Sequence, residues 1–270
     1  MTPSQPSTPP IITLTTDFGR QDGYVGAMQG VILNICPTAT IVHLSHSIPP
    51  QDINAAAFIL YQIFQYYPAH TVHCVVVDPS VGSKRRAVAV RTDHGTFVGP
   101  DNGVFSLALR AEGVNVLEAV TLTNPDYQLS GVSATFHGRD IFAPAAAFLA
   151  RGTEPDRLGP AAINLVQIDH LRLPEPGQPV EAAHIIHVDH FGNLILNITE
   201  LHLDRKDNPR FTIAGQTIPR LSRTFADVAA GELLAYVGSS HGHLEIAVRN
   251  GSAARRLGVK AGARVTVSRG

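Results

Sequence analysis

The sequence predicts an α/β N-terminal domain with a central, mostly parallel sheet, followed by a smaller all-β, barrel-like C-terminal domain. Two observations predict the first domain. Short apolar strands alternate with helical segments, and several strands end in an acidic residue followed by a tight turn. A third observation predicts the second domain, because only short alternating segments follow a proline-rich stretch and helical periodicity is scarce there.

The first domain is expected over residues 11–170, after a disordered leader at residues 1–10 that is rich in proline, serine and threonine. Short β-rich runs predict its strands at Ile11–Thr16, Thr40–Leu44, Thr71–Val77, Ala87–Arg91 and Thr96–Val98. Helices are expected at Gly23–Ile35, Gln51–Phe64 and Val104–Ala111, with a further helix around Pro144. The run at Thr71–Val77 is apolar almost throughout, which is typical of a strand buried on both faces.

The second domain is expected over residues 184–270, after a proline-rich, nonperiodic linker at residues 171–183. Its strands are predicted at His184–Val188, Leu194–Ile198, Arg210–Ile213, Leu233–Val237, Leu244–Val248 and Arg264–Val267. Segments this short, separated by turn residues, are typical of a small sandwich or barrel.

The bulk composition favours a folded, soluble globular protein with a small-molecule partner. The chain has 270 residues, 44% of them hydrophobic, and a formal net charge of -1, with 21 basic and 22 acidic residues spread along it. A charge balance of this kind gives no footprint for nucleic acid or an anionic membrane. No apolar run reaches the roughly 18 residues that a membrane span needs. Cys36 and Cys74 lie far apart, which argues against a disulfide scaffold and fits the cytoplasm.

Acidic residues stand where predicted strands end. Asp17, Asp78, Asp101 and Asp189 each follow an apolar run and come directly before or within a tight turn. Ligands of open α/β sheets bind at the carboxyl ends of the strands, so these acids favour a carboxylate-rich crevice. The alternative is that each aspartate only shapes its turn by accepting hydrogen bonds from nearby backbone amides.

A second group of reactive side chains lies at residues 135–140, Thr-Phe-His-Gly-Arg-Asp, just before a predicted helix. Such a loop can present the ring of His137 to a pocket. The alternative is an ordinary helix start that Asp140 caps while Arg139 is solvated. The histidines at 184, 187 and 190 do not suggest a metal site, because alternate residues of a strand face opposite sides.

Five motifs in this order resemble the S-adenosylmethionine hydroxide adenosyltransferase family, also called S-adenosylmethionine hydrolases, which are related to fluorinating and chlorinating enzymes. The motifs are Leu14–Gly19, Val77–Gly82 with the arginines 85 and 86, Gly99–Gly103, Thr135–Asp140 and Asp189–Asn193. The resemblance implies an enzyme that cleaves S-adenosylmethionine at C5′ with an activated water, without a cofactor or a metal. It also implies an α/β domain, a β-barrel domain and a homotrimer with active sites between subunits.

The resemblance also implies roles for individual residues. Asp78, Arg85 and His137 take the places of the family's water-activating set. The implied substrate contacts are Asp17, Asp78, Asp189, Asn193, Ser240, Glu245 and Val248, with Asp17 matching the acid that grips the ribose hydroxyls. Two positions depart from the family pattern, Ser80 where a glycine is common and an inserted His241.

Three other functions remain open at this stage. A halogenating relative would use chloride or fluoride as the nucleophile, but the carboxylate of Asp78 would repel a halide. A binding protein without catalysis could keep the same pocket. A metal-dependent hydrolase could be built on Asp17, Asp78, His137 and Asp140. Clearance of the R-epimer at sulfur is a further hypothesis, drawn from the family.

Overall fold

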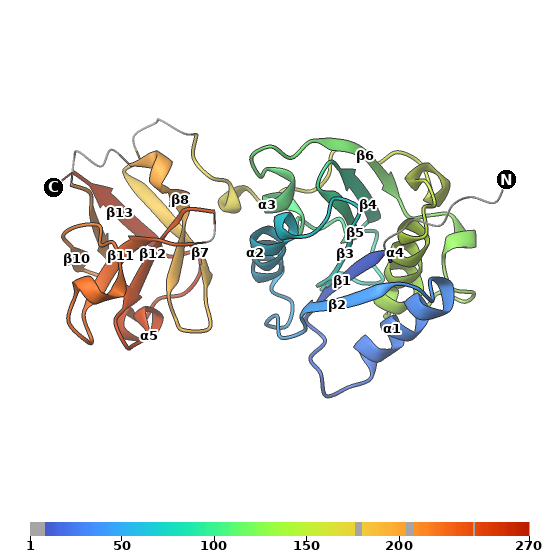
Figure 1. Cartoon of the computed structure of the whole chain (residues 1–270), viewed down its shortest axis with the longest axis horizontal. Helices are drawn as coiled ribbons and strands as arrows, with labels where there is room; N and C mark the ends of the chain where they lie inside the picture. The colour runs from blue at the N-terminus through green and yellow to red at the C-terminus, as the bar shows by residue number, and fades with distance from the viewer. Residues whose placement is uncertain (1–8, 176–179, 204–207, 240, 270) are drawn as a thin grey trace. The chain divides into compact units, whose positions relative to one another are not determined.

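The chain folds into two compact units, residues 1–167 and residues 168–270. The computed structural model describes residues 9–175, 180–203, 208–239 and 241–269 (Figure 1). The fold-class prediction is confirmed, because the first unit is α/β with a mixed sheet and the second is an antiparallel, barrel-like β domain. Most of the expected leader, residues 1–8, lies outside the described residues.

The first unit is built on a six-stranded sheet in the order β2-β1-β3-β5-β4-β6. The strands are β1 (Ile11–Thr16), β2 (Thr40–Ser45), β3 (Val72–Val76), β4 (Ala87–Thr92), β5 (Gly95–Pro100) and β6 (Val116–Thr121). β1, β2, β3 and β5 run parallel, whereas β4 is antiparallel to both of its neighbours. The sequence did not predict β6, and it is the strand that completes this edge.

Four α-helices cover the sheet: α1 (Tyr24–Ile35), α2 (Ile53–Ile63), α3 (Ser106–Leu109) and α4 (Ala143–Ala150). α1 packs against α4, and α2 packs against α3 (Figure 1). Asp52 caps α2 by accepting a hydrogen bond from the Ala55 amide at 2.9 Å. α3 is shorter than the predicted helix at 104–111, because the residues before it form turns around Gly103.

The strand order determines where the candidate site lies. β1 and β3 are parallel neighbours, with Thr16 in register with Val76, so residues 17 and 78 follow at the same edge of the sheet. From β1 the chain goes to β2 on one side, and β3 returns on the other side. Such a switch point leaves a crevice at the carboxyl ends of the strands.

The second unit contains a seven-stranded sheet in the order β10-β9-β13-β7-β8-β12-β11, in which every pair is antiparallel. Its strands are β7 (Ala182–Val188), β8 (Leu194–Thr199), β9 (Arg210–Ile213), β10 (Gln216–Ile218), β11 (Leu233–Val237), β12 (His243–Val248) and β13 (Arg264–Ser268). One short helix, α5 (Ala253–Leu257), follows β12. An isolated bridge joins Leu221, after β10, to Ala235 on β11, so the sheet is nearly closed.

The segment expected as a linker is partly ordered within the second unit. Leu171 is fully buried, and the Pro174 carbonyl accepts a hydrogen bond from Nε2 of His202 at 2.8 Å. β7 begins at Ala182, two residues before the predicted start of the domain. The proline-rich composition predicted irregular structure in this segment. It did not predict that Leu171 is buried or that Pro174 bonds to a residue of the second unit.

None of the helices in the described part of the chain combines the length and apolar character of a membrane-spanning segment.

Candidate active site

The candidate site is a cavity of about 560 Å³ at the carboxyl ends of β1 and β3. Its lining includes Asp17 after β1, Asp78 after β3, and Phe136 and His137 from the segment before α4. The volume is in the range of small-molecule sites, and the lining mixes aromatic rings with a few ionisable groups. The strand order thus brings together motifs that lie up to 120 residues apart in the chain.

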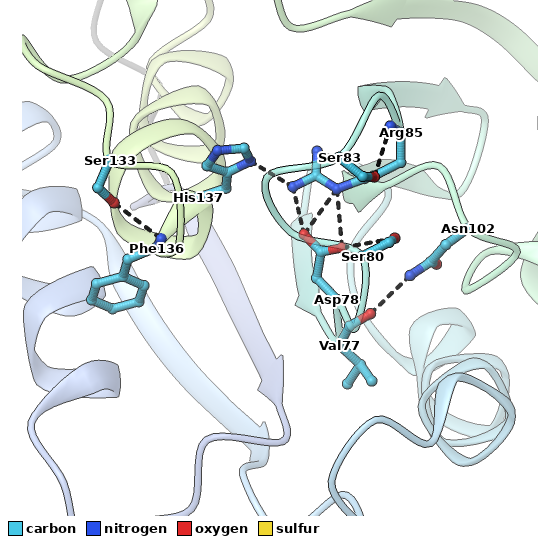
Figure 2. Close-up of polar contacts among 9 residues, drawn as sticks. All are labelled: Val77, Asp78, Ser80, Ser83, Arg85, Asn102, Ser133, Phe136 and His137. Carbon is cyan, nitrogen blue, oxygen red and sulfur yellow. Dashed lines mark hydrogen bonds and ion pairs between the residues drawn. The ribbon is translucent and has the colours of Figure 1, made fainter.

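Three side chains form a connected polar group at this cavity (Figure 2). Arg85 holds Asp78 through Nε, at 3.0 and 2.9 Å from the two carboxylate oxygens, and through Nη2, at 2.5 Å from Oδ2. The same Nη2 lies 2.7 Å from Nδ1 of His137. Both side chains of the ion pair are almost buried, 8% exposed for Arg85 and 6% for Asp78. The structure therefore brings together the three residues that the resemblance assigned to water activation.

The contact with Arg85 determines which proton His137 carries. A guanidinium has only N–H donors, so Nδ1 must accept the hydrogen bond and the ring proton must lie on Nε2. Burial lowers the pKa of His137, and the positive charge of Arg85 lowers it further, against opposing contributions from Asp78 and Asp140. His137 is therefore a neutral ring at neutral pH, and it orients Arg85.

A glycine allows the two halves of this polar group to approach. Gly82 has φ +79°, and a Cβ added to it would lie 2.6 Å from the backbone oxygen of Ala134. Only a residue without a side chain fits there. Gly82 therefore lets the loop that carries Arg85 pack against the segment that carries His137.

The strand end before Asp78 is held from a neighbouring loop. Nδ2 of Asn102, which follows β5, donates a hydrogen bond of 2.9 Å to the Val77 carbonyl (Figure 2). The hydroxyl of Ser80, one of the two departures from the family pattern, lies 3.4 Å from Oδ1 of Asp78. Serine at this position therefore adds a weak contact to the carboxylate and leaves its pairing with Arg85 intact.

His137 precedes one turn of π-helix at Gly138–Phe142, in which the Ala143 amide bonds to the Gly138 carbonyl. Pro144 explains the wide turn, because it has no N–H to donate to the Asp140 carbonyl four residues earlier. The Leu129 amide instead donates a hydrogen bond of 2.9 Å to the Asp140 carbonyl. The carboxylate of Asp140 accepts from the Ser133 amide and from Arg139, so it does not act as the helix cap.

Arg86 pairs with a different acid from its neighbour Arg85. Its Nε and Nη2 lie 2.8 and 2.5 Å from Oδ2 of Asp101, and its other contacts are the carbonyls of Ile163 and Asn164. Oδ1 of Asp101 accepts from the Val166 amide at 2.8 Å. Asp101 thus ties the last segment of the first unit to the end of β5, and it is absent from the cavity lining.

Asp17 faces the same cavity as Asp78. Its Oδ2 accepts a hydrogen bond from the Gln51 amide at 2.8 Å. No other described residue hydrogen-bonds its carboxylate, so Oδ1 is available to a ligand. One backbone donor thus orients the carboxylate while half of it remains free to accept hydroxyl protons.

An aromatic cluster completes the cavity, and sequence reasoning did not single it out. The rings of Phe18, Tyr24 and Phe136 pack edge-on or tilted, with centroids 5.3 to 5.9 Å apart. Phe18 and Phe136 lie inside two of the motifs. From the sequence alone, however, an aromatic residue beside a strand end is expected to belong to the hydrophobic core. Only the packing of distant segments shows that these rings line a cavity.

The second unit holds the remaining predicted contacts. Asp189 accepts hydrogen bonds from the backbone amide and from Nδ2 of Asn193, both at 2.8 Å, within the turn from β7 to β8. Glu245 is paired across the strands with Tyr236, whose hydroxyl donates to its carboxylate. Burial raises the pKa of Glu245, against the hydrogen bond from Tyr236, which lowers it, and the negative charge of Asp189 raises it further.

One predicted contact, Val248, has apolar neighbours instead. Val248 is buried in the apolar core of the second unit, where it packs with other strand residues. Ser240 lies outside the described residues. Tyr236 was not singled out from the sequence, because its pairing with Glu245 depends on the register between β11 and β12.

Among the described residues, no three histidine, cysteine, aspartate or glutamate side chains are arranged to hold a metal ion. The set considered for a metal-dependent hydrolase is divided by its hydrogen bonds. Asp78 is held by Arg85, whereas Asp140 is held by Ser133 and Arg139.

We expect the His137 ring to titrate below its usual value near 6.5, since burial and the Arg85 charge both disfavour the protonated form. Nitrogen chemical shifts of the ring, followed by NMR between pH 4 and 8 and assigned with His137→Asn, measure this directly. Arg85→Gln removes one of the two causes, so the midpoint should rise in that variant. A midpoint above 6.5 in the parent protein, or no rise in the variant, contradicts the assignment.

The chain is similar to known proteins over nearly its whole length. Residues 12–159 match the SAM hydroxide adenosyltransferase N-terminal domain, and residues 183–266 match the corresponding C-terminal domain. A protein from Salinispora tropica named (R)-S-adenosyl-L-methionine hydrolase is 44% identical, over 97% of this chain and 98% of its own. A fluorinase from Nocardia brasiliensis is 28% identical over 97% of each chain.

Among solved structures, an uncharacterized conserved protein from Thermotoga maritima is 34% identical with a TM-score of 0.85. The match covers 95% of this chain and 100% of that chain, so the similarity extends over both units.

Proposed function

The chain belongs to the SAM hydroxide adenosyltransferase family, and we propose on this basis that it hydrolyses S-adenosyl-L-methionine to adenosine and L-methionine. The observation that carries the proposal is the buried group of Asp78, Arg85 and His137 at a cavity of about 560 Å³. The names of the more similar relatives support it, since hydrolases of this substrate are 39% to 44% identical.

The reaction is a displacement at C5′ of the ribose. Water forms the new C5′–O bond as the C5′–S bond breaks, and the sulfonium leaves as the neutral thioether of methionine. No acid is needed at sulfur, so the enzyme has to orient a water molecule and remove its proton. General base assistance of this kind is typically worth about 10² to 10⁴ in rate.

Asp78 is the proton acceptor in this proposal. Nδ1 of His137 is already occupied by Arg85, and the other ring nitrogen carries a proton, so the imidazole has no free lone pair. Arg85 contacts both oxygens of Asp78, yet each carboxylate oxygen has two acceptor sites. A water molecule can therefore share the carboxylate with the guanidinium.

Substrate binding is divided between the two units. In the first unit, Asp17 accepts hydroxyl protons of the ribose through the oxygen that Gln51 leaves available. In the second unit, Asp189, Asn193 and Glu245 supply polar groups for the adenosine and methionine ends. Ser240 and Val248 remain proposed contacts on the strength of the family alone. No cofactor takes part in this mechanism.

The related activity is halide transfer, since fluorinases are more distant relatives at 25% to 28% identity. A halide needs no base and is repelled by a carboxylate, whereas a water nucleophile benefits from one. The nearly buried Asp78 therefore favours water as the nucleophile.

One incubation tests the proposal. The purified, EDTA-treated protein is mixed with each sulfonium epimer of S-adenosylmethionine in chloride buffer, and products are identified by mass spectrometry. We expect adenosine and methionine, formed faster from the R-epimer, as the names of the relatives suggest. Chlorinated adenosine would assign the chain to the halogenases. Activity that EDTA abolishes would favour a metal-dependent hydrolase, and binding without turnover would favour a sensor.

The assembly and location are also proposals. A homotrimer with active sites between subunits would let one chain supply the water-activating group and another supply the second-unit contacts. A trimeric mass in light scattering would support this arrangement, and a monomeric mass in the active protein would contradict it. The cytoplasm is the proposed location because its substrate is an intracellular metabolite.

A further inference from the structure

Arg85 has a third neighbour besides its two polar partners. Its guanidinium carbon lies 5.2 Å from the centre of the Phe142 ring. Phe142 is 0% exposed and belongs to the apolar core of the first unit, so its ring has little freedom to move. A fixed aromatic face attracts a cation most strongly where water is excluded, and Arg85 itself is only 8% exposed.

The π-turn is what allows Phe142 and His137 to reach the same guanidinium. The two residues are five positions apart, and both contact Arg85. In an α-helix, residues five positions apart are rotated by about 140° and face different directions. The Gly138–Phe142 turn has i→i+5 bonding, which widens the turn and brings such residues onto one side.

We propose that Phe142 is a positioning residue for hydrolysis, which acts by holding the Arg85 guanidinium between Asp78 and His137. The ring fixes the plane of the guanidinium from the core side, while the carboxylate and the imidazole fix it from the cavity side. This inference deepens the proposed function, on which its kinetic readout rests. Phe142 is not itself one of the residues that line the cavity, and in the proposed mechanism it does not touch the substrate.

The test compares Phe142→Leu with Phe64→Leu. Phe64 is also 0% exposed in the first unit, but it packs against Phe97, lies outside the core cluster that contains Phe142, and does not line the cavity. Both variants lose a buried ring, so both should lose thermal stability. Only Phe142→Leu should lower kcat, by about 10-fold, with KM within about 2-fold of the parent. Equal kcat in the two variants, corrected for folded protein, would overturn the proposal.

A second readout does not depend on catalysis. If the ring holds Arg85 against His137, its loss lets the positive charge move away, and the NMR titration midpoint of His137 should rise in Phe142→Leu but not in Phe64→Leu. This comparison remains valid even if the parent protein does not turn over S-adenosylmethionine. An unchanged midpoint in Phe142→Leu would count against the positioning role alone.

A third variant covers the case in which leucine prevents folding. Pentafluorophenylalanine at position 142 keeps the ring shape but reverses the charge of its face, which removes the attraction to a cation. We expect the same fall in kcat and the same rise in the His137 midpoint. Parent values of both quantities in this protein would overturn the proposal, because shape alone would then account for the role of Phe142.

Discussion

Asp78→Asn should lower kcat by about 10² to 10⁴-fold, the range lost when a general base is removed. The amide has nearly the shape of the carboxylate but cannot accept the proton of water. It also leaves the nearly buried Arg85 guanidinium without an anionic partner. Steady-state kinetics with S-adenosylmethionine measure the effect, which should fall mainly on kcat because the lost interaction acts in the transition state.

The matched control for this variant is Asp126→Asn, at an exposed position outside the cavity lining. It makes the same chemical change and should retain parent kinetics. Removing one partner of a buried ion pair is destabilising, so circular dichroism and a thermal melt must show that Asp78→Asn is folded. A folded Asp78→Asn protein with parent kcat would mean that another group takes the proton.

Asp17→Asn should raise KM by about 10- to 150-fold and change kcat little. The amide oxygen would keep the hydrogen bond from Gln51, which turns the NH2 group toward the ligand. The ribose hydroxyls would then face a donor instead of an acceptor. Hydrogen bonds to a charged group contribute about 1.5 to 3 kcal/mol, which corresponds to this range of KM.

Asp52→Asn is the control for the second variant. Asp52 follows Gln51 and caps α2, and asparagine caps a helix about as well as aspartate. This control should leave KM unchanged while altering charge only a short distance along the chain from Gln51. If Asp17→Asn binds substrate like the parent, the ribose is held by other residues, and the second unit becomes the place to search.

The first unit was predictable where local pattern determines structure. Apolar runs ending in acids predicted β1 and β3, and the rule that parallel strands place ligands at their carboxyl ends predicted that Asp17 and Asp78 share one crevice. The strand β6 was not predicted, because its run at Val116–Thr121 contains a glutamate and is short. β6 forms the edge of the sheet because it pairs with β4, and the local sequence of a strand does not show which strand it pairs with.

The rest of the site depends on contacts between distant residues. Arg85 and His137 are 52 positions apart. The family resemblance predicted that they belong to one site, whereas the periodicity of the sequence could not predict it. The π-turn has a local cause in Pro144, but its consequence, a shared contact with Arg85, requires the loop after β3. In the second unit, the partner of Glu245 follows from strand register, which a sequence of short strands leaves undetermined.

The two adjacent arginines impose a constraint on loop length. Arg85 is paired with Asp78 in the candidate site, whereas Arg86 is paired with Asp101 and with the carbonyls that close the first unit. Deleting one residue from the loop after β3 would put Arg86 in the place of Arg85, and inserting one would put Arg85 in the place of Arg86. Natural variation in this loop should therefore change residue types and preserve their number, because a shift of one position would cost both the chemistry and the closure of the domain.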